Sequence, residues 1–149
     1  MALNPEFAGR TYPAEGSYVV GREKVREFAA AVDEASPLSL DVAAAQAAGY
    51  PDVVAPPTFA IVLALGASEK VVTDPELGLD YSRVVHSEQR FAYSRPIVAG
   101  DELVVTTTIE SVRSVAGNDI ITTRADIATI QGESVCVAHS QLLSRGADA

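Results

Sequence analysis

One short segment of this chain has no polar side to turn toward water. Residues 59–65 read Phe-Ala-Ile-Val-Leu-Ala-Leu, so a helix through them is apolar on every side. The prolines Pro56 and Pro57 just before it cannot sit inside a helix but suit its first turn. Such a helix cannot rest on a surface by one face alone. The rest of the chain must therefore cover it on all sides.

The second half of the chain has the composition of long strands. Three stretches are rich in valine, isoleucine and threonine and are longer than an average strand of about five or six residues: 102–115, 120–130 and 134–143. Turn signals separate them at 99–101, 116–119 and 131–133, which predicts antiparallel hairpins. A long curved antiparallel sheet wrapped around a central apolar helix accounts for both halves. We therefore expect the α+β class and a hot-dog fold.

The first half reads as helical. Residues 21–33 carry apolar side chains at spacings of three and four, which predicts an amphipathic helix. Asp41 is expected to cap a second helix over 42–48 that Gly49 ends. A chain of 149 residues suits one domain and is short for two. We expect a single domain over 1–149, with an ordered core from about 9 to 145.

Charge and hydropathy exclude several functions. The net charge is −9, with 20 acidic against 11 basic residues, and the bases are scattered, so nucleic acid is not an expected partner. The longest apolar run, 59–66, is shorter than the roughly 20 residues that span a bilayer. The N-terminus lacks the basic start and apolar segment of a signal peptide. We expect a cytoplasmic protein without membrane insertion.

The few potential metal ligands are far apart in the sequence. The chain has one cysteine, Cys136, and two histidines, His86 and His139, in no ligand-like spacing, so no metal site is expected. Cys136 is interpreted as a small buried side chain. His139 alternates with apolar residues, which predicts a largely apolar face and a structural role.

Three segments resemble the MaoC-like hot-dog family: 21–29, 55–59 and 86–101. The similarity runs from about Gly9 to Arg145 and points to the group that contains the A and C subunits of the mycobacterial-type (3R)-hydroxyacyl-acyl-carrier-protein dehydratase. The resemblance implies interconversion of a trans-2-enoyl and a 3-hydroxyacyl thioester. It also implies no cofactor, a substrate carried on coenzyme A or acyl carrier protein, and a catalytic aspartate and histidine in one short motif.

The chain departs from that motif at the reacting residues. Alignment on Pro37 puts Glu34 at the aspartate position, Ser36 at the asparagine position and Ser39 at the histidine position. Removing water needs one group to take a proton and another to protonate the leaving hydroxyl. Ser39 does not titrate in the working range, and the extra methylene of Glu34 shifts a carboxylate where about 1 Å can cost about a hundredfold. A one-residue slip to Asp33 restores no histidine, so no catalytic residue is expected in this chain.

The resemblance also suggests residues that contact substrate: Pro56, Pro57, Thr58, Phe59 and His86. Each has a structural alternative that stays open. The prolines can serve only to start a helix, and Phe59 can belong to the core. His86 lies in the segment expected to lead into the first long strand, and it too can be structural.

Three functions remain at this point. The first is a substrate-binding, catalytically incomplete subunit of a heteromeric (3R)-3-hydroxyacyl-thioester dehydratase or trans-2-enoyl hydratase in fatty-acid metabolism, paired with a MaoC-like subunit that carries the aspartate and histidine. The second is a non-catalytic hot-dog homodimer that binds an acyl thioester or another apolar ligand. The third is an enzyme acting alone, with Glu34 as base and an acid such as His86.

Overall fold

The computed structural model describes residues 3–146; the predicted domain also includes residues 1–2 and 147–149, which lie outside that range. In chain order the elements are η1 (Pro5–Phe7), β1 (Thr11–Tyr12), β2 (Tyr18–Val19), α1 (Arg22–Ala31), α2 (Pro37–Leu40), α3 (Val42–Ala47), α4 (Ala60–Val72), η2 (Tyr81–Arg83), β3 (Val84–Tyr93), β4 (Glu102–Val115), β5 (Asn118–Thr129) and β6 (Ser134–Ser144). Within the described residues the six strands form one antiparallel sheet in the order β1-β4-β5-β6-β3, and β2 also pairs with β4.

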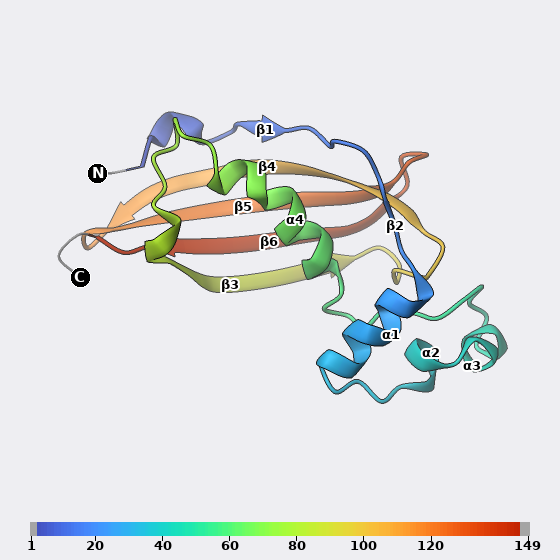
Figure 1. The fold of residues 1–149 in the computed structure, drawn as a ribbon. Coiled ribbons are helices and arrows are strands. Elements are labelled where there is room, and N and C mark those ends of the chain that lie inside the picture. The colour runs from blue at the N-terminus through green and yellow to red at the C-terminus, as the bar shows by residue number, and fades with distance from the viewer. Residues whose placement is uncertain (1–2, 147–149) are drawn as a thin grey trace.

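The apolar helix α4 lies across one face of this sheet, and α1, α2 and α3 gather at one end (Figure 1). Ala64 packs on Ala125 and Ala138, small residues that let the helix approach β5 and β6 closely. The hot-dog arrangement and the α+β class are confirmed. The expectation that α4 is covered on all sides is wrong. A single sheet packs against one side of the helix, and Leu65 is 50% exposed. No helix in the described part of the chain is both long and apolar enough to cross a bilayer.

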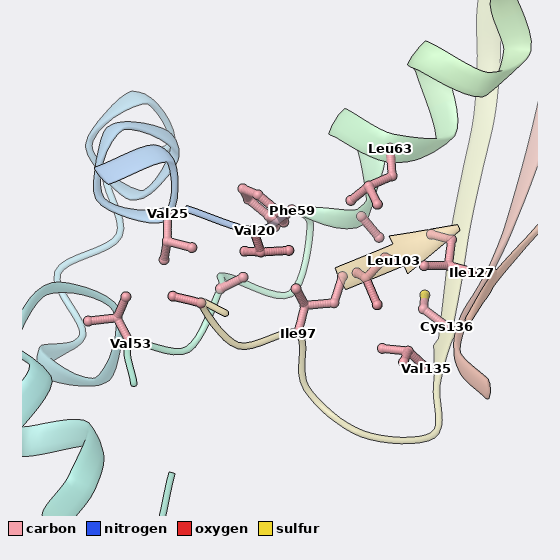
Figure 2. Close-up of a cluster of buried hydrophobic side chains, with 13 residues drawn as sticks. Val20, Val25, Val53, Phe59, Leu63, Ile97, Leu103, Ile127, Val135 and Cys136 are labelled. Carbon is pink, nitrogen blue, oxygen red and sulfur yellow. The ribbon is translucent and has the colours of Figure 1, made fainter. Parts of the chain in front are cut away.

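The main core joins the sheet to the helical end. Phe59, at the start of α4, is fully buried and meets the ring of Phe28 edge-on, with ring centroids 5.3 Å apart. Figure 2 shows Phe59 with Val20, Leu103 and Ile97 around it. Cys136 belongs to the same cluster, as expected of a small buried side chain. Burial raises the pKa of its thiol to about 11.

Local signals set the helix ends and the tightest turn. The Asp41 carboxylate caps α3 by accepting hydrogen bonds from the amides of Ala43 at 2.8 Å and Ala44 at 3.4 Å, as expected. Gly49 follows that helix with φ +96°, the left-handed conformation that ends it. Ala116 and Gly117 both have positive φ, at 50° and 80°, which marks a two-residue hairpin turn. This tight turn starts β5 at residue 118 rather than the predicted 120.

Two histidine positions differ from expectation. His86 lies inside β3, not in a segment that precedes a strand. His139 has charged cross-strand partners, Arg124 and Arg90, and its Nε2 is 3.5 Å from the Glu110 carboxylate. The prediction failed because cross-strand neighbours decide the character of a sheet face, and they are distant in sequence. A register shift between β5 and β6 also breaks the simple alternation along β6.

Strand β3 ends the sheet. It pairs with β6 on one side, and among the described residues no strand covers its other side. An uncovered edge of this length presents a row of backbone donors and acceptors to which another strand can pair.

Candidate functional site

The residues that align with the catalytic motif meet at one cavity. It lies where α2 approaches the end of β3 and has a volume of about 550 Å³, within the range of roughly 300–1,000 Å³ of small-molecule sites. The lining residues are Glu34, Ser36, Leu38, Ser39, Val54, Ala55, Pro56, Pro57, Tyr93, Ser94, Arg95, Pro96 and Ile97. Polar and apolar side chains are thus mixed around one hollow.

The end of helix α1 brings Glu34 into this cavity. Asp33 adopts the left-handed conformation with φ 58°, and the Glu34 amide then donates to the Ala29 carbonyl at 2.8 Å. Glu34 lines the cavity, whereas Asp33 is exposed and does not. The Glu34 carboxylate accepts a hydrogen bond from the Ser36 amide at 2.8 Å. Of the two acidic residues at the end of α1, it is therefore Glu34 that lines the cavity.

The hydroxyls of the two serines of the motif form hydrogen bonds with nearby backbone groups. The Ser36 hydroxyl caps α2 by accepting from the Leu38 amide at 3.4 Å, and Pro37 takes the first helical position. Ser39 is 4% exposed, and its hydroxyl donates to the Val54 carbonyl at 2.6 Å. Ser39 thus ties α2 to the segment that leads to Pro56, and its hydroxyl proton is engaged in that bond.

Tyr93 and Arg95 form part of the other wall. The Tyr93 hydroxyl donates to the Pro57 carbonyl at 2.6 Å, and burial raises the pKa of Tyr93 well above its usual range, so the hydroxyl stays protonated. Arg95 forms a two-pronged ion pair with Asp101 at 2.9 and 3.0 Å and a further bond to Glu133 at 2.8 Å. Hydrogen bonding to Asp101 raises the pKa of Arg95, which keeps its charge.

The other predicted substrate contacts lie at different places. Pro56 and Pro57 line the cavity, but Thr58, Phe59 and His86 do not. Thr58 is exposed, and Phe59 is part of the core. His86 is exposed on β3, with its Nε2 3.0 Å from the Glu88 carbonyl oxygen.

The sequence did not single out Tyr93, Ser94 or Ile97 as site residues. They line the cavity because β3 ends beside the prolines, which brings residues about 36 positions apart into contact, as the bond from Tyr93 to Pro57 illustrates. The signal that could have found them was the turn motif Ser-Arg-Pro directly after an alternating strand.

The chemistry of the cavity is limited to one carboxylate. Among the described residues that line it, Glu34 contributes the carboxylate, while the Tyr93 hydroxyl stays protonated because burial raises its pKa and Arg95 stays charged because Asp101 raises its pKa. No histidine from residues 3–146 lines it. In the same range, no group of three or more His, Cys, Asp and Glu side chains is placed to hold a metal ion.

Comparison with known proteins agrees with this fold. The model of the family described as FAS1-like, dehydratase domain region, matches residues 6–138, and the chain belongs to this MaoC-like hot-dog family. A relative named UPF0336 protein, from Saccharopolyspora erythraea, is 55% identical over 146 residues, which cover 98% of this chain and 94% of the relative.

Two solved structures are also similar. A MaoC-like dehydratase has a TM-score of 0.87 at 38% identity; the match covers 95% of this chain but 43% of that one, so this chain spans less than half its length. The C-terminally truncated HadBC complex from Mycobacterium tuberculosis, a (3R)-hydroxyacyl-ACP dehydratase, has a TM-score of 0.84 at 33% identity, with 93% of this chain and 97% of that chain covered.

Proposed function

We propose that this chain is the substrate-binding, catalytically incomplete subunit of a heteromeric (3R)-3-hydroxyacyl-thioester dehydratase or trans-2-enoyl hydratase in cytoplasmic fatty-acid metabolism. One observation carries the proposal: the cavity at the motif keeps a carboxylate, Glu34, but has Ser39 where a histidine would act. Elimination needs an acid and a base. The Ser39 hydroxyl already donates its hydrogen bond to the Val54 carbonyl, so the chain supplies at most one of the two catalytic groups.

The open edge of β3 supports a partner. Two hot-dog sheets that join edge to edge pair the free backbone groups of both edge strands. A homodimer would contain two sites without histidine, whereas a heterodimer with a subunit that carries the aspartate and histidine would contain one complete pair. Similarity to the HadBC complex, at 33% identity, favours the heterodimer.

The substrate in this proposal is an acyl thioester carried on coenzyme A or acyl carrier protein. Pro56 and Pro57 are in the cavity wall, which supports their proposed contact with substrate. Thr58 and His86 are exposed, so both are accessible at surfaces that a partner could cover. Phe59 would act indirectly, by fixing the start of α4 behind the prolines.

Hydration of a medium-chain trans-2-enoyl-CoA tests the proposal through loss of its conjugated absorbance. The assay is run with the purified chain, with a MaoC-like subunit that carries Asp and His, and with the mixture. Turnover is expected above the sum of the separate rates in the mixture only, together with a one-to-one complex in native mass spectrometry. Replacing the partner's histidine is expected to abolish this turnover, whereas Glu34→Gln in this chain is expected to reduce it far less.

Two outcomes would overturn the proposal. Turnover by this chain alone, lost in Glu34→Gln and in His86→Asn, would make it an enzyme in its own right. Absence of turnover in every mixture, together with a tight homodimer that retains an acyl ligand, would make it a non-catalytic binding protein.

A further inference from the structure

A second cavity lies on the side of α4 away from β3. It has a volume of about 500 Å³ and lies between α4, β4 and the N-terminal segment that contains β1 and β2. The lining residues are Tyr12, Pro13, Glu15, Gly16, Ser17, Tyr18, Val62, Leu63, Gly66, Ala67, Glu69, Lys70, Thr73, Leu103, Val105 and Thr107. Three segments that are distant in the sequence thus build one hollow within a single chain.

This cavity is separate from the candidate site. The two share no lining residue. One core cluster contributes to both: Leu63 and Leu103 form a wall of the second cavity, Ile97 forms a wall of the first, and Phe59 belongs to the same cluster (Figure 2). A molecule in the second cavity would therefore not need the β3 edge or a partner subunit.

The floor of the cavity contains an unsatisfied hydroxyl. Thr107 on β4 is 2% exposed, and its Oγ1 makes no hydrogen bond with any group of residues 3–146. Leaving a buried polar group without a partner costs about 1–3 kcal/mol, and buried polar atoms rarely lack one. The surrounding floor is apolar, formed by Val62, Leu63 and Val105. The Oγ1 atom itself has almost no accessible surface, so a ligand with an apolar body and one hydrogen-bonding group would satisfy Thr107 once its side chain rotates toward the cavity.

The charges at the rim select against an anion. The Lys70 ammonium lies 3.0 Å from the Glu15 carboxylate and donates to the Pro13 carbonyl at 3.2 Å. Glu69 adds a second carboxylate to the lining. The rim therefore carries one negative charge in excess, on a chain with net charge −9. A carboxylate or phosphate would have to displace Glu15 and face Glu69.

We propose that the second cavity binds an uncharged amphipathic molecule, with its hydrocarbon body against α4 and β4 and one hydroxyl or carbonyl oxygen at Thr107. Its volume lies within the roughly 300–1,000 Å³ of small-molecule sites. Because a liquid water occupies about 30 Å³, an organic molecule of on the order of 15 heavy atoms would fill it. This site is independent of the proposed dehydratase role.

Two adjacent residues of α4 make a matched test. Gly66 lines the cavity, and a Cβ at this position has no atom within 4 Å, so Gly66→Leu is expected to place its side chain in the cavity. Leu65, its neighbour, is exposed and does not line the cavity. Leu65→Gln therefore removes apolar surface outside the cavity. Thr107→Val keeps the shape of the side chain and removes its hydroxyl.

The probe is N-phenyl-1-naphthylamine, an uncharged fluorophore that brightens in apolar sites. The chain is expected to bind it, with displacement by decan-1-ol at a concentration at least tenfold lower than by decanoate. Gly66→Leu is expected to lower probe binding at least tenfold at the site from which decan-1-ol displaces the probe, and Leu65→Gln to leave it unchanged. Thr107→Val is expected to lower the affinity for decan-1-ol about three- to tenfold, because one hydrogen bond contributes about 0.5–1.5 kcal/mol. The same variant is expected to bind the probe unchanged. Circular dichroism checks that each variant is folded.

Three results would overturn the proposal. They are no probe binding by the unaltered chain, unchanged binding in Gly66→Leu, or binding lost in Leu65→Gln instead. Equal displacement by decan-1-ol and decanoate would overturn the assignment of an uncharged ligand. Should Gly66→Leu fail to fold, Gly66→Ala, with its smaller side chain on the same open space, together with Thr107→Val, decides the question.

Discussion

Replacing Phe59 with alanine separates its two interpretations, a core residue or a contact for the acyl chain. The side chain is fully buried and lines neither cavity. A phenylalanine buries about 150–250 Å², which at about 25 cal/mol per Å² is an upper estimate of about 4–6 kcal/mol. Measured core truncations of this kind cost about 3–5 kcal/mol. The edge-to-face contact with Phe28 adds about 0.5–1.5 kcal/mol.

We therefore expect Phe59→Ala to lower the free energy of unfolding by about 4 kcal/mol, and the melting temperature by on the order of 10 °C. Urea unfolding measures the first and calorimetry the second. Thr58→Ala is the matched control, since the adjacent side chain is exposed and its loss should stay within about 0.5 kcal/mol. A cost below about 1 kcal/mol for Phe59→Ala, with weaker binding of an acyl ligand, would refute the core assignment.

Three further changes test other parts of the structure. Asp101→Asn should lower the free energy of unfolding by about 1–2 kcal/mol, because it weakens the ion pair with Arg95 and the bond from the Val98 amide; an unchanged urea midpoint would contradict this. The thiol of Cys136 should resist labelling at pH 8 until the chain unfolds. Burial raises its folded-state pKa to about 11, so stability should fall as pH rises from about 9 to 11, where the unfolded thiol ionises first; rapid labelling of the folded chain would count against this. Asp33→Gly should leave stability equal or raise it by up to about 1 kcal/mol, since φ is 58° there; a clear loss would point to an unseen role for the carboxylate.

The fold was predictable because its signals are local. The run Phe59 to Leu65 is apolar on every side and gives α4, and the bounds of β4 match the predicted stretch from Glu102 to Val115. The start of β5 was missed by two residues, because the left-handed conformations of Ala116 and Gly117 shorten the turn. Composition marks a turn more reliably than it gives the number of residues in it.

The candidate site was only partly predictable, because its walls come from distant segments. The motif frame placed Glu34, Ser36 and Ser39 together, and they do line one cavity. Nothing local indicates that the Tyr93 hydroxyl reaches Pro57 or that Arg95 bonds to Glu133, 38 positions away. These contacts follow from the order of strands in the sheet. That order also leaves His86 exposed on the edge strand, which the alternation of its own segment cannot reveal.

The order of strands also bears on how the chain folds. Strands β4, β5 and β6 follow one another through short turns, so their hairpins close small loops and can form early. Strand β3 must find β6 across contacts such as Gln89 with Ser140, 51 positions apart, and β1 reaches β4 across 97 positions at Thr11 and Thr108. We expect both outer strands to dock last. Each carries a wall of one cavity, Tyr93 from β3 and Tyr12 from β1, so both proposed binding sites would be completed last as the chain folds and lost first on partial unfolding.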